Sequence, residues 1–184
     1  LEAYRTELLM NRKRQQAALA STENKLESCA APANSDVSAI TCDAVCMVPK
    51  LPDGSYLMIR EFRYPLNALC LAFPAGLIDQ GETLEQAVDR ELREETGFCI
   101  RQSAVTPLRA LAQPGFSSTG MSDESVQVVF VQVEKAEDAH PESSEIIEPF
   151  IVQPSEIRTL LNDKAYLIGT RTQLILELLA QQAN

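Results

Sequence analysis

Three glutamates near the middle of the chain are spaced so that they could hold a divalent cation. They lie in a predicted helix with an apolar stripe, and at about 100° per residue Glu91 and Glu95 fall inside that stripe, with Glu94 at its edge. Like charges four residues apart repel one another, strongly where water is excluded, unless a positive charge lies between them. Hard divalent cations prefer carboxylate oxygens. The spacing alone leaves two interpretations open, a metal site and a solvated, salt-bridged helix surface.

The ends of this helix are marked by the residues beside it. Thr83 and Gln86 form a capping-box pattern that satisfies exposed backbone donors at the start. Gly97 is the residue type that most easily adopts the left-handed conformation after a last helical turn. Upstream, residues 74–76 read Pro-Ala-Gly and predict a bend that delivers backbone carbonyls to the foot of the helix.

The segment from Gly76 to Phe98 resembles the Nudix box, G-x5-E-x7-R-E-U-x-E-E-x-G-U, where U is apolar. Every fixed position matches, from Gly76 and Glu82 to the run 90–98. So long a pattern is specific, and the resemblance favours the metal site over the salt-bridged surface. It implies the Nudix fold, an α+β (mixed α/β) arrangement in which a mixed β-sheet is sandwiched between helices.

Two further segments resemble the ADP-ribose pyrophosphatase (ADP-sugar pyrophosphatase) branch of that family. They are residues 60–65, Arg-Glu-Phe-Arg-Tyr-Pro, and residues 73–82, which lead into the box. Pro114, sixteen residues beyond Phe98 in a Pro-Gly-Phe loop, is a further mark of the branch. The resemblance implies Mg²⁺-dependent hydrolysis of the diphosphate of ADP-ribose or a related ADP-sugar to AMP and a sugar phosphate. Mn²⁺ is the alternative ion.

The branch also implies which residues bind the metal. The ligands would be Glu91, Glu95 and the backbone carbonyl of Ala75, with Glu94 either a ligand or an acceptor beside them. Arg90 would orient Glu91 or Glu94 through a charge-assisted hydrogen bond.

The catalytic base and the substrate contacts come from other segments in the same resemblance. The base belongs to an acidic loop well after the box, where Glu145 is the best match and Glu142 the second. Arg63 would hold the diphosphate, although spacing alone allows an edge arginine that extends into solvent. The implied substrate-binding residues are Arg63, Pro114, Gly115 and Phe116.

Two departures from the branch concern the substrate. Ala72 stands where members commonly carry a glutamate, and the chain has no tryptophan to stack on adenine. Alternative substrates are therefore another nucleoside diphosphate derivative, such as a UDP-sugar, a GDP-sugar or a dinucleotide, or a nucleoside triphosphate. A non-catalytic nucleotide-sensing module is a different class of function. The intact box and the absence of a basic helix-turn-helix pattern disfavour it.

The chain has the length of one domain with a peripheral extension. We expect an N-terminal arm and linker at 1–36 and the Nudix hydrolase domain at 37–184. By resemblance the protein would be a homodimer in which each arm completes the pocket for the nucleobase in the partner subunit. A net charge of −10 disfavours nucleic acid and anionic membranes as partners.

Cysteine content and hydropathy predict a cytoplasmic protein. The five cysteines are odd in number and lack C-x-x-C spacing, so we expect reduced, mostly buried thiols. No stretch is apolar enough to span a membrane, and the charged first twenty residues contain no signal-peptide core.

The remaining elements are predicted from hydrophobic periodicity. We expect a polar loop at 113–124, an acidic loop at 134–148, and a helix opened by Pro154. The final helix at 165–180 should bury Ile168, Leu174, Ile175, Leu178 and Leu179. Strands are expected at 39–48, 56–63, 68–73, 104–112, 125–133 and 149–153.

Overall fold

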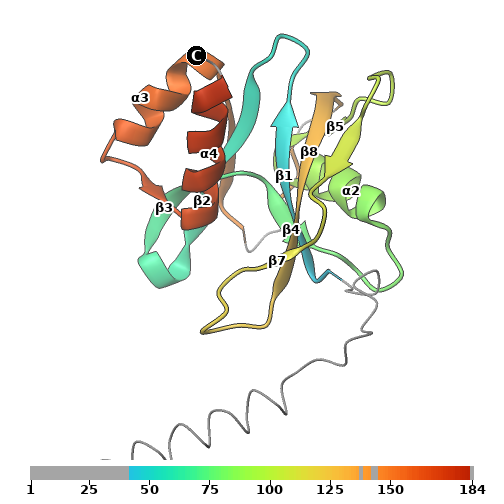
Figure 1. The fold of residues 1–184 in the computed structure, drawn as a ribbon, viewed down its shortest axis with the longest axis horizontal. Coiled ribbons are helices and arrows are strands. Elements are labelled where there is room, and N and C mark those ends of the chain that lie inside the picture. The colour runs from blue at the N-terminus through green and yellow to red at the C-terminus, as the bar shows by residue number, and fades with distance from the viewer. Residues whose placement is uncertain (1–41, 137–138, 142–144, 183–184) are drawn as a thin grey trace, which may run out of the picture. The chain divides into compact units, whose positions relative to one another are not determined.

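The computed structural model describes residues 42–136, 139–141 and 145–182 (Figure 1). The predicted N-terminal arm and Glu142 lie outside these residues. The three α-helices of the described chain are α2 (Leu84–Thr96), α3 (Ile157–Asn162) and α4 (Thr170–Gln182). Two short 3₁₀ helices are η2 (Tyr64–Leu66) and η3 (Pro154–Glu156).

Ten strands of the described chain form a mixed sheet. Its main path runs β10-β3-β2-β1-β8-β5, with β4 paired to β1, β6 and β7 to β8, and β9 to β2. The pairing of β1 with β8 is parallel, whereas β1 with β4 and β2 with β9 are antiparallel. The strands are β1 (Ala44–Lys50), β2 (Tyr56–Arg63), β3 (Ala68–Ala72), β4 (Ala75–Leu77), β5 (Phe98–Ile100), β6 (Leu108–Ala110), β7 (Gly115–Phe116), β8 (Ser125–Lys135), β9 (Ile147–Val152) and β10 (Leu167–Ile168).

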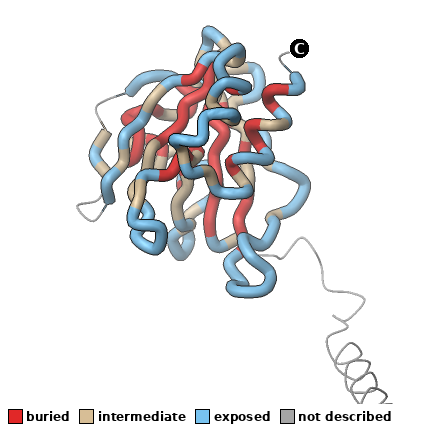
Figure 2. The backbone as a smooth tube through the Cα atoms, turned by 90° about the vertical axis from the view of Figure 1, so that its left-hand side faces the viewer, coloured by how far each residue is buried: buried red, intermediate tan, exposed pale blue. Residues whose placement is uncertain are grey.

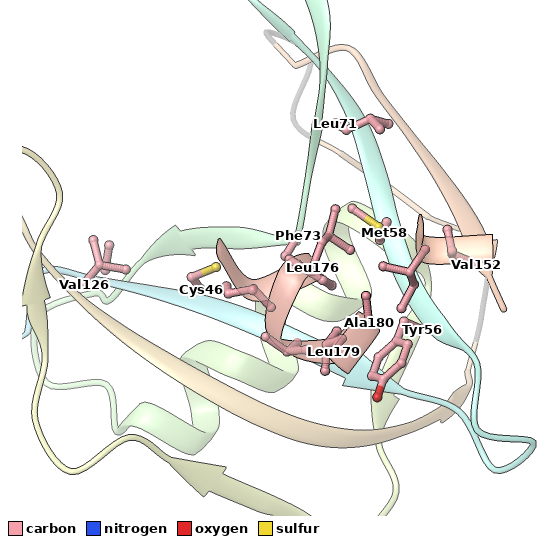
Figure 3. Close-up of a cluster of buried hydrophobic side chains, with 14 residues drawn as sticks. Cys46, Tyr56, Met58, Leu71, Phe73, Val126, Val152, Leu176, Leu179 and Ala180 are labelled. Atoms are coloured by element: carbon pink, nitrogen blue, oxygen red, sulfur yellow. The ribbon is translucent and has the colours of Figure 1, made fainter. Parts of the chain in front are cut away.

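The sheet buries apolar side chains on both faces, and alternation along β1 shows why. Val45 and Met47 pack on the α2 side, whereas Cys46 and Val48 pack on the side of α3 and α4. Figure 2 shows the buried strands between exposed loops. Figure 3 shows Leu176 among the buried side chains on the side of α3 and α4. Helices covering both faces of a mixed sheet confirm the predicted fold class (Figure 1).

Helix α2 has the predicted ends. The Thr83 hydroxyl accepts a hydrogen bond from the Gln86 N–H, the Gln86 side chain accepts one from the Thr83 N–H, and Gly97 has a left-handed φ of 72°. The glutamates are buried in the order that the helical spacing predicts. Glu95 is 3% exposed, while the side chains of Glu91 and Glu94 are 13% and 44% exposed.

Several predicted boundaries are wrong. Of the strand expected at 104–112 only Leu108–Ala110 forms, because Pro107 follows a turn in which the Ala104 N–H bonds to the Arg101 carbonyl. The last helix begins at Thr170 rather than at 165. Its phase leaves Leu174 and Leu178 more than half exposed and buries Leu176 instead.

Two expectations about composition can be compared with the described residues. Cys46 and Cys70 are buried free thiols, and Cys42 and Cys99 are partly buried free thiols. None of the helices described here combines the length and the apolar composition needed to cross a membrane.

Candidate active site

Arg90 is the centre of a charge network at the inner flank of α2. Its Nη1 donates to Glu91 Oε1 at 2.7 Å and to Glu94 Oε2 at 3.2 Å. Its Nε and Nη2 donate to the two carboxylate oxygens of Glu82 at 3.0 and 2.9 Å, and Nη2 also donates to the Leu77 carbonyl at 2.9 Å. The bidentate hydrogen bond that Arg90 donates to Glu82 is the main cause of the raised pKa of Arg90, and the same bond lowers the pKa of Glu82. One guanidinium therefore fixes the positions of three carboxylates.

Strand β4 brings backbone atoms to the same place. β4 pairs antiparallel with β1, so that Cys46 lies opposite Ala75 and Val45 opposite Gly76. The Ala75 N–H donates to Glu95 Oε2 at 3.2 Å. The residues expected to form a bend thus form a short strand, which presents its backbone to the buried glutamate of α2.

Glu95 is a buried carboxyl group surrounded by other acids. Burial raises its pKa to about 9, and the negative charges of Glu91, Glu61 and Glu145 act in the same direction. Burial also raises the pKa of Glu91, although the hydrogen bond from Arg90 opposes it. At neutral pH without a cation, Glu95 keeps its proton. A bound cation would stabilise the charged carboxylate and so oppose this rise in pKa.

A cavity of about 500 Å³ opens above these groups. It is lined by residues of β1, β4 and β8 together with charged side chains. The acidic lining residues are Glu61, Asp79, Glu91, Glu94, Glu124 and Glu145, and the basic ones are Arg63, Arg90 and Arg171. The excess of carboxylates makes the cavity negative, so that it would attract cations before it accepted an anionic substrate.

A second hollow, of about 620 Å³, lies along α2 and shares Arg90 and Glu94 with the first cavity. Several of its other polar residues are paired with one another, since Arg93 donates to Asp89 at 2.8 Å and Gln102 donates to Glu85 at 3.2 Å. It is larger than the first cavity but lacks the β4 backbone and Arg63. We therefore take the cavity beside Gly76 as the candidate site.

Most of the residues predicted for the site lie together here. The cavity is lined by Arg63, Ala75, Arg90, Glu91, Glu94 and Glu145. Glu95 lies beside them, bonded to Ala75. By contrast, Pro114, Gly115 and Phe116 do not line the cavity; Gly115 and Phe116 form β7, and Phe116 is 57% exposed.

The fold also brings to the cavity residues that were not predicted from the sequence. Glu61 forms an ion pair with Arg63, whose Nη2 lies 2.8 Å from Glu61 Oε2, and burial raises the pKa of Glu61 while Arg63 opposes that shift. Alternation along β2 gave a signal for it, because Glu61 shares a face with Leu57, Ile59 and Arg63. Asp79 and Glu124 had no such signal.

Arg171 is the missed residue that comes from farthest along the chain. It lies in the first turn of α4, and its Nη2 donates to Ser117 Oγ at 2.8 Å. Ser117 in turn donates to a carboxylate oxygen of Glu124. Arg171 also lies close to the Cys46 thiol, where it opposes the rise in pKa that burial causes.

The donor set fits a hard divalent cation, although the present rotamers do not form a finished site. Across the described ranges, no three His, Cys, Asp or Glu side chains could hold an ion together. One reason is that the Glu91 carboxylate is turned to Arg90. The fit comes from the chemistry, because Glu91 and the buried Glu95 offer carboxylate oxygens and β4 adds backbone carbonyls.

The chain is similar to known proteins along most of its described length. A match to the NUDIX domain covers residues 41–169. The ADP-ribose pyrophosphatase of Saccharomyces cerevisiae is 32% identical over 148 residues, which are 75% of this chain and 63% of the yeast protein. The ADP-sugar pyrophosphatase of Mus musculus is 37% identical over 82 residues, 42% of this chain and 37% of the mouse protein. This chain thus spans less than two thirds of either relative.

A solved structure gives the same result for the fold. The crystal structure of an ADP compounds hydrolase matches with a TM-score of 0.60 and 26% sequence identity. The match covers 76% of this chain and 73% of that chain. Sequence and fold therefore agree on the kind of domain.

Proposed function

Because the chain belongs to the NUDIX domain family, we propose that it hydrolyses the diphosphate of ADP-ribose or a related ADP-sugar and releases AMP and a sugar phosphate. The observation that carries this proposal is the Arg90 network. A single guanidinium holds Glu82, Glu91 and Glu94 beside the β4 backbone, at the edge of a cavity that also contains Arg63. The names of the yeast and mouse relatives support the substrate class.

The proposed metal is Mg²⁺, with Mn²⁺ as the alternative, held by Glu91, Glu95 and the Ala75 carbonyl, with Glu94 beside them. When bound, it supplies charge neutralisation at the diphosphate and polarises the bond to be broken. Arg90 keeps Glu91 and Glu94 in place. Substitution of these four side chains should weaken metal binding and leave the fold intact.

The other groups act on the substrate and the attacking water. Arg63, from the end of β2, would bind a diphosphate oxygen through its guanidinium, for which it would have to leave Glu61. Glu145 lines the same cavity and would accept the proton of the water that attacks phosphorus. The expelled phosphate carries the negative charge, which the cations around the cavity stabilise.

A wider range of ADP compounds is a second candidate. Ala72 and the lack of tryptophan remove two contacts that would select ADP-ribose. The matching structure is that of an ADP compounds hydrolase, which supports ADP compounds as the substrate class and keeps dinucleotides among the alternatives. UDP-sugars and GDP-sugars follow as less favoured substrates.

A panel of substrates tests the proposal. The full chain would be incubated with ADP-ribose, other ADP-sugars, a dinucleotide, a UDP-sugar and a GDP-sugar, each with Mg²⁺ and with Mn²⁺. We expect AMP from the ADP compounds and slower release of UMP or GMP. Preferential cleavage of UDP-sugars would reject the adenine assignment, and binding without any cleavage would indicate the sensing module.

The assembly and the location of the protein remain predictions. The resemblance favours a homodimer in which residues 1–36 take part. The cytoplasm is the location that the sequence favours.

A further inference from the structure

Among the described residues, the three arginines at the candidate site differ in how their charges are paired. Arg90 binds three carboxylates, and Arg63 binds Glu61 at 2.8 Å. Arg171 donates instead to the neutral hydroxyl of Ser117 at 2.8 Å, and no described carboxylate forms an ion pair with it. A guanidinium has five N–H donors, and the described residues use only part of this capacity in Arg171, at Ser117 and at the Cys46 thiol.

The position of Arg171 places this capacity beside the metal-binding residues. It lines the cavity together with Ala75, Gly76 and Glu91. It also lies close to Cys46, which is the direct β1 partner of Ala75. Helix α4 therefore brings a cation to the cavity that the glutamates of α2 also line.

The charges of the cavity require such a group. Its carboxylates repel a diphosphate. Bound divalent cations would neutralise those carboxylates but would not contact every phosphate oxygen. Arginine suits the remaining oxygens because its planar donors match the geometry of a phosphate. We propose that Arg171 is a substrate-binding residue that contacts the diphosphate, so that the C-terminal helix contributes to the site. This inference rests on the proposed function, in that it takes a diphosphate as the substrate.

The contact with Ser117 suggests how Arg171 is held before substrate arrives. The Ser117 hydroxyl accepts from Arg171 and donates to Glu124, and the Ser117 N–H donates to the Glu124 carbonyl at 3.0 Å. This closed loop keeps the guanidinium at the cavity wall without neutralising it. A hydroxyl is a weaker partner than a phosphate, so the arginine can change partners when a diphosphate enters.

Binding measurements on Arg171→Gln, Arg171→Lys and Ser117→Ala test the proposal. The probe is ADP-ribose with a methylene bridge in place of the bridging oxygen, titrated calorimetrically with Mg²⁺. We expect Arg171→Gln to weaken binding about 10- to 100-fold. Arg171→Lys should recover part of the loss, because it keeps the charge but not the planar donors. Ser117→Ala should weaken binding less than Arg171→Gln does, because it removes the group that holds the guanidinium but leaves the guanidinium itself.

The outcomes separate a substrate contact from a structural one. Unchanged affinity in Arg171→Gln would overturn the proposal, as would an equal loss in Ser117→Ala, which would reduce Arg171 to an anchor of the 113–124 loop. Inorganic pyrophosphate, titrated in parallel, reports the diphosphate contact without the nucleoside. If wild type cleaves no nucleotide in the panel but Arg171→Gln still loses pyrophosphate binding, the proposed function fails and the Arg171 assignment stands. Thermal unfolding checks that each variant is folded.

Discussion

The carboxylate of Glu91 occupies the space into which a side chain on Gly76 would project. A Cβ atom at position 76 would lie 2.0 Å from both the Cδ and the Oε1 of Glu91. Gly76 does not have a positive φ, so the absence of a side chain here is required by the glutamate and not by the turn. The glycine of strand β4 and the glutamate of α2 therefore form one site.

Gly76→Ala should impair function far more than folding. The methyl group meets the end of a flexible side chain, so Glu91 can rotate away at little cost in stability but leaves its place beside Ala75 and Arg90. We expect a melting temperature near that of wild type and a loss of turnover of about 10²-fold, together with weaker Mg²⁺ binding. Gly169→Ala is the matched control, because its methyl group enters open space. Equal activity in both variants would contradict this account.

Glu95→Gln should abolish turnover and keep the fold. The buried carboxyl group of Glu95 is protonated near neutral pH without a metal, so a neutral amide of the same shape replaces it with little strain. A divalent cation, however, loses an anionic ligand. Glu85→Gln makes the same change at an exposed position of the same helix and should keep full activity. Near-normal turnover of Glu95→Gln with Mg²⁺ would reject Glu95 as a ligand.

Stability without metal should fall as the pH rises from about 4.5 to about 9. The pKa of Glu95 is raised from its ordinary value of 4.5 to about 9, so between these values the folded chain keeps a proton that the unfolded chain has released. Folding then binds a proton, and raising the pH opposes it. Melting temperatures measured with a chelator should decline over this range more steeply in wild type than in Glu95→Gln. Mg²⁺ competes with that proton, so its stabilising effect should grow with pH; parallel slopes in the two proteins would contradict the shift.

Local signals were enough to predict α2 and the order of its buried glutamates. The capping box at Thr83, the left-handed Gly97 and the apolar stripe are all properties of one continuous segment. The bounds of β2 were also predicted correctly, because the Pro-Asp-Gly sequence at 52–54 predicts a turn directly before a returning strand. Short strands such as β4 and β7 carry too few residues for a period to be visible, and they exist because β1 and β8 pair with them.

The missed residues depend on tertiary structure. Arg171 lies eighty positions beyond Glu91, and only the packing of α4 on the sheet brings it to the cavity. The phase of α4 was wrong for a similar reason, since the helix begins at Thr170 and turns Leu174 outward. Sequence spacing constrains neighbours along one element, whereas a site shared by α2, β2, β4 and α4 is set by how the elements pack.

Removal of residues 1–36 tests the homodimer. If the arm completes the partner's nucleobase pocket, as the resemblance implies, the shortened chain should sediment as a monomer and bind ADP-ribose more weakly. Sedimentation velocity and calorimetric titration measure the two effects separately. An unchanged mass together with unchanged affinity would remove the arm from both the interface and the site. A changed mass with unchanged affinity would leave it in the interface alone.

Glu145→Gln should slow hydrolysis about 10²-fold and leave substrate binding nearly intact. Glu145 lines the cavity, and its charge raises the pKa of Glu61, Glu91 and Glu95, which places it close to the ligands. A positioned general base contributes roughly this factor, and an amide cannot accept the proton. Single-turnover rates separate the chemical step from binding.

Two further variants test the assignment of Glu145 as the general base. Glu148→Gln is the matched control, because Glu148 points to Arg60 at 3.5 Å and does not line the cavity. It should keep the wild-type rate. Glu142→Gln is the competitor from the same acidic segment, and a loss of about 10²-fold there with little loss in Glu145→Gln would move the base to Glu142. A comparable loss in Glu148→Gln would show that the charge of the segment matters, and not a single proton acceptor.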